Sequence, residues 1–120
     1  MNWIELDSKE ILEEARNASH QEPVVLLKYS NRCSLSSLTL DRLERSWIED
    51  EMAVIKTYFL DLIAYRDISD LVAQIFNVRH ESPQVLVIYK GECTFHSSHF
   101  AVSYETLKDQ INTHRSSVSG

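Results

Sequence analysis

The stretch VVLLKYSNRCSLSS, residues 24–37, joins a run of apolar residues to a helical pattern through a short polar loop. Residues 24–27 are all apolar and begin with two β-branched valines, which predicts a strand buried on both faces of a sheet that helices cover. From residue 35 to residue 47, leucines and a tryptophan recur near helical spacing. Cys33, one of only two cysteines in the chain, lies in the loop between them. The stretch therefore predicts a strand–loop–helix unit with a thiol at its turn.

Outside this unit, the sequence continues to alternate between helical and strand patterns. Asp7 and Ser103 are residues of the type that caps helices, and apolar residues recur at helical spacing after each of them. Runs of β-branched and aromatic residues predict strands, and the turn at Lys90 and Gly91 predicts a hairpin. The further elements expected are helices over 7–15, 68–75 and 104–111, and strands over 3–6, 53–59, 84–89 and 93–97.

The order of these elements predicts the fold class. Because strands 24–27, 53–59 and 84–89 alternate with helices, we expect them to be parallel neighbours with right-handed crossovers, and the hairpin to add an antiparallel edge. This succession is typical of an α/β, thioredoxin-like fold with a central mixed sheet of four to five strands flanked by helices. We expect one domain over residues 1–115 and a flexible C-terminal tail over 116–120.

The composition excludes several classes of partner. The chain has 120 residues and a net charge of −6, which argues against nucleic acid and against an anionic membrane surface as partners. No apolar stretch is long enough to span a membrane, and no signal peptide is visible, so the expected compartment is the cytoplasm. In a reducing compartment two cysteines are expected to be free thiols.

The position of Cys33 predicts a reactive thiol. It lies where the first central strand ends and a helix begins, and ligands of open α/β sheets bind at this end of the strands. The partial positive charge of a helix N-terminus stabilises a thiolate, and Arg32 adds a cation. Ser36 completes a Cys-x-x-Ser motif, whose hydroxyl can hydrogen bond the thiolate without forming a disulfide, which leaves monothiol exchange. The alternative is a small buried cysteine without reactivity.

Pro83 supports the reactive interpretation. It lies 50 residues after Cys33 and directly before a predicted strand. Thioredoxin-like folds place a cis-proline there, facing the thiol, so that the backbone of the preceding residue, Ser82, can pair with an extended substrate. The alternative is a trans proline that merely begins a strand.

Three segments together resemble the monothiol bacilliredoxin family: SNRCSLSS at 30–37, HESPQVLVI at 80–88 and HSSHF at 96–100. The resemblance covers about residues 3–111. It implies a thioredoxin-like fold and a thiol–disulfide oxidoreductase that removes bacillithiol from S-bacillithiolated proteins. Bacillithiol would be the thiol co-substrate, with no bound cofactor.

The resemblance also implies roles for single residues. Cys33 matches the nucleophile and Pro83 the cis-proline. Family members often have proline where this chain has Ser34, which keeps its N–H and is expected to offer it to the sulfur. The candidate substrate-binding residues are Arg32, Ser34, Ser36, Ser82, Pro83 and His99.

The second cysteine and the histidines lie in the predicted hairpin. A strand over 84–89 that begins beside Cys33 runs roughly 20 Å away from it, so we expect no disulfide between Cys33 and Cys93. The return strand leads from His96 to His99, one of which could bind the substrate or a bacillithiol carboxylate; the alternative is that both are exposed polar residues at a strand end. Zinc ligands of this type are known, but Cys93 and His96 are expected on opposite faces of the strand, so no metal site is predicted.

Two other functions remain open at this point. A thioredoxin fold can serve as a non-catalytic adaptor, since one fold hosts many functions. It can also be a redox sensor, in which peroxide oxidises Cys33 to a sulfenic acid. Hydrolysis through a Gly-x-Ser-x-Gly elbow and a phosphate-binding loop are excluded, because the only glycines are Gly91 and Gly120.

Overall fold

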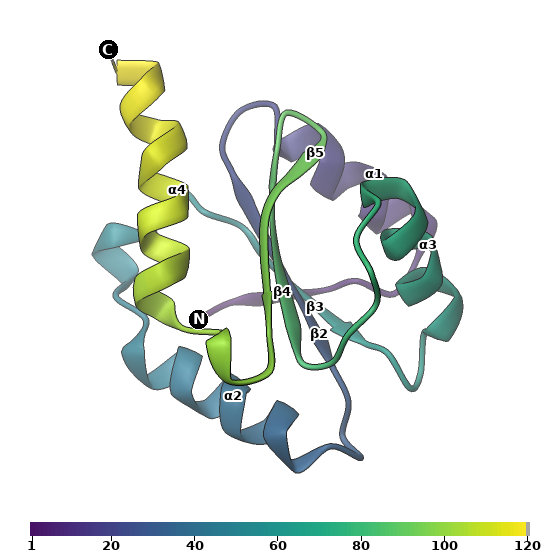
Figure 1. The fold of residues 1–120 in the computed structure, drawn as a ribbon. Helices are drawn as coiled ribbons and strands as arrows, with labels where there is room; N and C mark the ends of the chain where they lie inside the picture. The colour runs from purple at the N-terminus through teal and green to yellow at the C-terminus, as the bar shows by residue number, and fades with distance from the viewer. Residues whose placement is uncertain (120) are drawn as a thin grey trace.

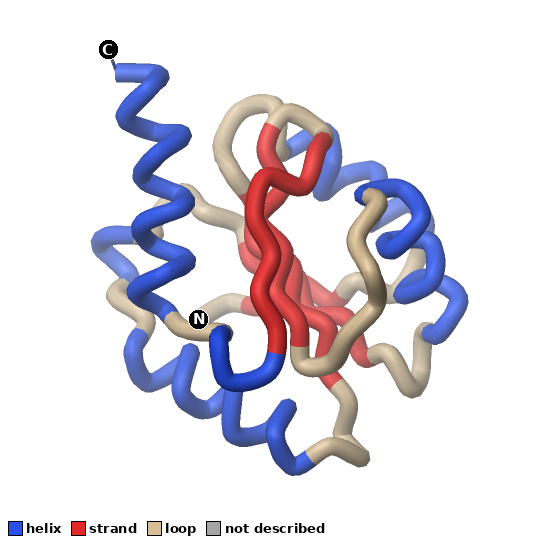
Figure 2. Tube along the Cα trace, in the orientation of Figure 1, coloured by secondary structure: helices blue, strands red, loops and turns tan. Residues whose placement is uncertain are grey.

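A mixed sheet separates two pairs of helices (Figures 1 and 2). The computed structural model describes the backbone of residues 1–119 and the side chains of residues 1–115. Within this part of the chain, the elements in order are β1 (Trp3–Glu5), α1 (Lys9–Ala18), β2 (Val24–Tyr29), α2 (Ser34–Ser46), η1 (Glu49–Glu51), β3 (Thr57–Asp61), α3 (Arg66–Phe76), β4 (Gln84–Tyr89), β5 (Glu92–Ser98), η2 (His99–Ala101) and α4 (Tyr104–Ser119).

The helix α4 extends beyond its predicted end at residue 111 into the predicted tail. Its backbone continues to Ser119, while Gly120 lies outside the described residues. The flexibility of residues 116–120 stays a prediction.

The sheet has the strand order β1-β3-β2-β4-β5, with β2 at its centre. β1 and β2 are both parallel to β3, whereas β4 is antiparallel to both β2 and β5. The predicted mixed sheet and its antiparallel edge are confirmed, and the short strand near the N-terminus exists as β1. The fold is the predicted α/β class, with helices on both faces (Figure 1).

The direction of β4 differs from the prediction of three parallel central strands. Val25 pairs with Val87 and Lys28 with Gln84, so β4 begins where β2 ends. The reason is the segment 77–83, which follows the left-handed C-cap of α3 at Asn77. Seven residues of extended chain reach roughly 23 Å, which exceeds the roughly 16 Å length of α3. The segment can therefore return the chain to the end of the sheet where β2 leads into the Cys33 loop, the active end, before β4 begins.

The buried side chains form two cores, one on each face of the sheet. Val24 and Leu26 of β2 belong to the core under α1 and α3. Val25 and Leu27 belong to the core under α2 and α4. The continuous apolar run therefore reflects burial on both faces, as predicted. Lys28 continues the alternation onto the α1/α3 face, where it is fully buried.

Two predicted boundaries are shifted by local hydrogen bonds. The strand predicted at 53–59 is β3 over Thr57–Asp61, since Ile55 N–H donates to Met52 O in a turn. The cap of α1 is Ser8 rather than Asp7, because Ser8 Oγ accepts a hydrogen bond from Ile11 N–H at 3.2 Å. Ser103 caps α4 as predicted, and its Oγ accepts from Thr106 N–H.

Candidate functional site

The loop between β2 and α2 holds Cys33 at the start of the helix. Cys33 N–H donates to Ser30 O at 3.1 Å, and Arg32 N–H donates to Ser30 Oγ at 3.2 Å. This turn leaves Cys33 with extended dihedrals (φ −115°, ψ 112°), and α2 begins at Ser34. Cys33 is therefore the N-cap residue, and its sulfur lies at the positive end of a 13-residue helix.

The environment of Cys33 favours the thiolate. The side chain of Cys33 is partly exposed, and it forms no side-chain capping hydrogen bond to α2. The Ser36 N–H, and with it the Leu35 N–H and the Ser36 hydroxyl, stabilise the charged sulfur and hold the pKa of Cys33 below its usual value, against a smaller effect of burial. The arrangement combines access with activation, which nucleophilic thiols require.

The amides that stabilise the sulfur are not those expected from the sequence. Ser34 is exposed and is the first residue of α2, whereas the amides that lower the pKa of Cys33 are those of Leu35 and Ser36. An N-cap side chain faces the second and third amides of its helix, here Leu35 and Ser36. Arg32 is exposed, and the groups that lower this pKa are Ser36 and Leu35. The predicted roles of Ser34 and Arg32 toward the sulfur and toward the substrate stay predictions.

Ser36 connects three parts of the site. Its side chain is 1% exposed, and its Oγ accepts a hydrogen bond from Ser30 N–H at 3.3 Å. The same Oγ lies 3.4 Å from Ser82 Oγ, on the segment that precedes β4. Ser36 thus ties the Cys33 loop to the segment that carries Pro83, in addition to stabilising the thiolate.

Pro83 and His99 lie side by side at the active end of the sheet. The Ser82–Pro83 peptide bond is cis, and Pro83 is buried at the start of β4. Pro83 O accepts a hydrogen bond from His99 N–H at 2.9 Å. The His99 side chain is exposed, and its backbone adopts φ 56°, in the left-handed region. The structure therefore brings His99 to the segment that touches Ser36.

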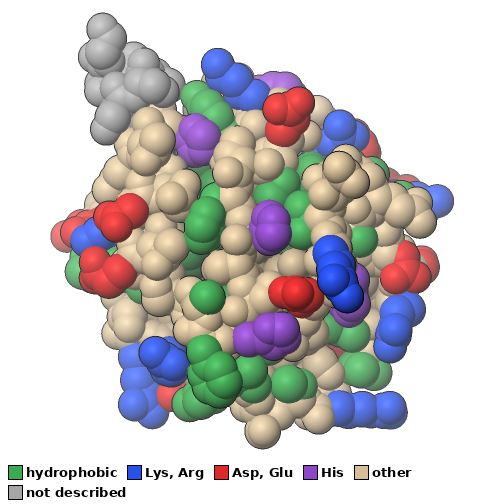
Figure 3. Space-filling model, in the orientation of Figure 1, with side chains coloured by type: hydrophobic (Ala, Val, Ile, Leu, Met, Phe, Trp, Pro, Cys, Tyr) green, Lys and Arg blue, Asp and Glu red, His purple; other side chains and the backbone are tan. Residues whose placement is uncertain are grey.

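Glu81 belongs to the same cluster, although no local pattern in the sequence marks it as a site residue. A hydrogen bond from Ser98 holds the pKa of the Glu81 carboxyl below its usual value, helped by the charges of His99, Arg79 and His96. Figure 3 shows histidines gathered beside an acidic side chain on the face where β5 lies. The position of Glu81 directly before Ser82 was the available signal, but only the fold of β5 back onto this segment reveals its partners.

Comparison with known families decides the identity of the chain. The family model described as monothiol bacilliredoxin BrxC matches residues 4–107. The chain belongs to the monothiol bacilliredoxin family. Membership in this family, with the activated thiol of Cys33, supports a thiol redox function.

Solved structures agree with the fold of this family member. One protein with a thioredoxin fold, described as a candidate oxidoreductase, is 28% identical over 91% of this chain and 92% of its own, with a TM-score of 0.75. The Malassezia sympodialis thioredoxin is 12% identical (94% and 90% covered, TM-score 0.73). The Trypanosoma brucei brucei thioredoxin is 14% identical (96% and 92% covered, TM-score 0.72). At such identities the two thioredoxins show the fold alone.

Cys93 of this family member lies in a different environment from Cys33. Both cysteines are free thiols in the structure. Cys93 pairs with Ile88 near the far end of the hairpin and packs against the α1/α3 core. Its Sγ–H donates to Phe95 O at 3.3 Å, and burial raises the pKa of Cys93 to about 11. Cys93 is a packed strand residue, as expected.

The hairpin contains an irregularity that strict strand alternation does not predict. The register shifts at Val87 and Ile88, so Cys93 pairs with Ile88 while His96 pairs with Leu86. A β-bulge changes the alternation of faces, and Cys93 and His96 therefore lie on the same face rather than on opposite faces. Even so, within the described part of the chain no group of three His, Cys, Asp or Glu side chains could hold a metal ion.

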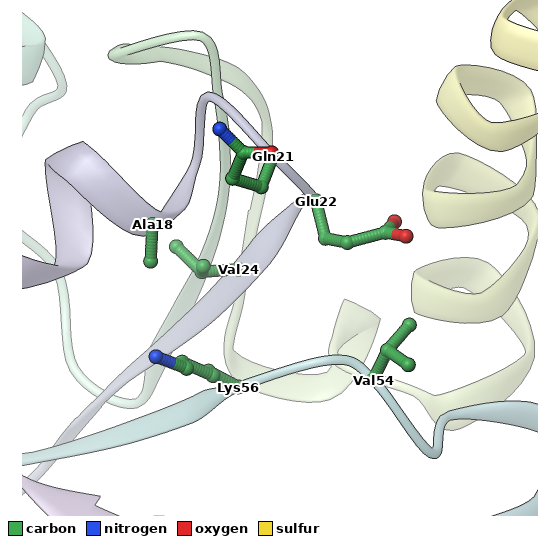
Figure 4. A pocket seen from close by; sticks show the side chains of 6 residues that line it. All are labelled: Ala18, Gln21, Glu22, Val24, Val54 and Lys56. Atoms are coloured by element: carbon green, nitrogen blue, oxygen red, sulfur yellow. The ribbon is translucent and has the colours of Figure 1, made fainter.

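The described residues contain no helix that is long and apolar enough to cross a membrane. One small pocket, of about 130 Å³, lies at the opposite end of β2 from Cys33 and is separate from the site (Figure 4). It is lined by Ala18, Gln21, Glu22, Val24, Val54 and Lys56.

Proposed function

We propose that this protein is a monothiol thiol–disulfide oxidoreductase that removes bacillithiol from S-bacillithiolated proteins. The observation that carries the proposal is the Cys33 thiol, which is accessible at a helix N-terminus and has a lowered pKa. Ser36 stands three residues later, where a dithiol enzyme has its second cysteine. Since Ser36 cannot resolve a disulfide, the attacking thiol must exchange with a second molecule.

The proposed reaction consists of two exchanges without net oxidation. In the first, the Cys33 thiolate attacks the bacillithiol sulfur of a protein–bacillithiol disulfide. The Cys33–bacillithiol disulfide forms, the bond to the client breaks, and the client leaves as a thiolate. In the second, the thiolate of free bacillithiol attacks the bacillithiol sulfur, which releases Cys33 as a thiolate and forms bacillithiol disulfide. Bacillithiol is thus a co-substrate, and no bound cofactor is needed.

The surrounding residues have proposed binding roles. The backbone at Ser82 and Pro83 pairs with an extended segment of the client beside the mixed disulfide. His99 and Arg32, both exposed near the ends of this site, bind the carboxylates of bacillithiol. Ser34, the first residue of α2, offers its hydroxyl to the substrate as a hydrogen-bonding group. These roles fit a reducing compartment such as the cytoplasm.

The experiment that tests the proposal is intact mass spectrometry of the reduced protein after incubation with a bacillithiolated model protein. We expect the mass of one bacillithiol on Cys33 and its loss from the model protein. The Cys33→Ser variant should acquire nothing, and the Cys93→Ser variant should behave like the wild type. If no bacillithiol moves, the function is wrong. Sulfenic acid on Cys33 after peroxide would then support a sensor, and an inert Cys33 would support an adaptor.

A further inference from the structure

Lys28 is a buried cation directly beneath the active end of the sheet. Its side chain is 0% exposed on β2, which otherwise contributes apolar residues to both cores. Its Nζ donates to Ser69 O at 3.2 Å and lies 3.1 Å from His80 Nδ1. Ser69 Oγ lies 3.4 Å from the same ring nitrogen. The mechanism proposed above uses none of these groups. Burying an ammonium costs free energy that only its hydrogen bonds and nearby charges offset, so these contacts need a reason.

These contacts join the two segments that form the thiol site. Lys28 is two residues before Ser30, whose oxygens hold the turn at Cys33. His80 is three residues before Pro83, whose oxygen holds the His99 amide. The contact between Nζ and Nδ1 therefore fixes the start of the proline segment to the strand that leads into the Cys33 loop.

A second hydrogen bond holds the same segment to the same face. Gln84 pairs with Lys28 across β2 and β4, so both side chains lie on one face of the sheet. Gln84 is 1% exposed, and its Nε2 donates to Arg79 O at 2.9 Å. Lys28 and Gln84 thus hold adjacent residues of one segment, at Arg79 and His80.

We infer that Lys28 and His80 are positioning residues that hold the segment 79–83, and with it Pro83, against the Cys33 loop. The inference concerns the geometry of the site, and only its effect on thiol transfer rests on the proposed function. Neither residue touches the reacting sulfur. A loosened segment would still carry a reactive Cys33, but would present a less ordered surface to the client.

The charges around the pair make this contact sensitive to pH. Burial lowers the pKa of Lys28 to about 8, against the opposing charge of Asp70. Burial, Lys28 and Arg66 lower the pKa of His80, against Asp70 and Glu81. At pH 7 a charged Lys28 therefore donates to a neutral ring at Nδ1. The residues that pair with Lys28 on the two adjacent strands, Leu60 on β3 and Gln84 on β4, are uncharged. Since burial under this segment lowers the pKa of Lys28, the closed position of the segment becomes more favourable as Lys28 loses its proton above pH 8.

The first test uses His80→Ala, since His80 is exposed and its replacement leaves both cores intact. The readout is the hydrogen-exchange protection factor of the His99 amide, which reports the position of Pro83. We expect it to fall about tenfold in the variant while amides of β2 keep theirs. In the wild type this protection factor should rise between pH 7 and pH 9, and in the variant, where Lys28 is less buried, it should rise less. His20→Ala, an exposed histidine near Gly91 at the hairpin turn, is the matched control and should change nothing.

The second test measures kinetics with a bacillithiolated model protein. We expect His80→Ala and Lys28→Met to raise KM about tenfold, with kcat and the alkylation rate of Cys33 within about twofold of wild type. Unchanged protection of the His99 amide in His80→Ala would overturn the inference, whatever the kinetics. Lost protection in a protein that moves no bacillithiol would uphold the positioning role and reject the proposed function instead.

Discussion

The active end and the hairpin end of the sheet each contain one cysteine, and the pKa values of the two thiols are shifted in opposite directions. Cys33 lies at a helix N-terminus, where backbone amides and a hydroxyl lower its pKa. Cys93 lies on a strand against an apolar core, where burial raises its pKa to about 11. Both side chains are partly exposed, so exposure alone does not separate them. The difference teaches that donors directed at the sulfur lower the pKa of one thiol, whereas packing against an apolar core raises the pKa of the other.

The largest expected effect is the loss of transfer in Cys33→Ser. A serine hydroxyl is not ionised at neutral pH and cannot form a disulfide, so transfer should fall to the rate seen without protein. The free energy of unfolding should stay within about 0.5 kcal/mol, because the side chain is partly exposed at a helix cap. The measurement is the release of the model protein's thiol with time. Transfer that persists in this variant would show that Cys33 at the active end is not the nucleophile.

Alkylation of the two cysteines should differ at least about 100-fold at pH 7. A pKa near 11 leaves about one Cys93 in ten thousand as thiolate, whereas a pKa below the usual 9.0 leaves at least about one Cys33 in a hundred. Peptide mass spectrometry after iodoacetamide treatment measures both rates in one sample. Comparable rates for the two sites would remove the basis of the comparison.

Lys28 extends the comparison to a cation at the active end. Its pKa is lowered from 10.5 to about 8 in the folded protein, so the unfolded chain binds more protons between these values and stability rises with pH across this window. Relative to Lys28→Met, the wild type should gain about 1–3 kcal/mol between pH 8 and pH 10.5. Urea unfolding of both proteins at several pH values isolates this contribution, since other groups titrate in both. If the stabilities of the two proteins changed in parallel with pH, the lowered pKa of Lys28 would be contradicted.

Ser36→Ala should have a smaller effect on the thiol. The hydroxyl is lost but the Ser36 N–H, the largest cause of the lowered pKa of Cys33, remains. The pKa should rise while staying below its usual value, and alkylation at pH 7 should slow about two- to fivefold. Because Ser30 N–H loses its partner, stability should fall by about 1–2 kcal/mol. Ser37→Ala, in the same helix turn, is the control: it loses only an exposed contact of 3.2 Å with Tyr29 OH, so it should leave the pKa of Cys33 unchanged and stability within about 0.5 kcal/mol.

The smallest expected effect belongs to Cys93→Ala at the hairpin end. The substitution removes a sulfur that packs against the core and should cost about 1 kcal/mol of stability with no change in transfer rate. Thermal unfolding and the transfer assay measure the two quantities on one sample. A marked loss of transfer would show that the two ends of the sheet are coupled.

Much of the fold could be predicted from short-range patterns in the chain. Three elements lie where the sequence predicts them: strand β2, the start of α2 directly after Cys33, and the hairpin of β4 and β5. The cap of α1 was assigned one residue too early, because Asp7 and Ser8 are both good caps and only the backbone conformation distinguishes them. The site was predicted less completely: Ser36 and Pro83 are where expected, but Glu81 and His80 gain their importance from distant partners.

Lys28 shows why the remainder could not be predicted. A lysine at the end of an apolar run is compatible with an exposed strand end, and nothing nearby in the chain indicates that Ser69 and His80 would cover it. Its burial depends on α3 and on the segment 77–83, which lie about 40 to 55 residues later in the sequence. The same segment reverses β4, which the alternation of helices and strands does not specify.

The sequence by itself determined the order of the elements, the two-sided burial of β2 and the location of a thiol at a helix start, because periodicity and capping act within a few residues of one another. Only the tertiary structure decided the direction of β4, the bulge that brings Cys93 and His96 to one face, and the contact between Lys28 and His80. These depend on strand pairing and on side-chain packing between residues that are distant in the chain, which no local pattern encodes.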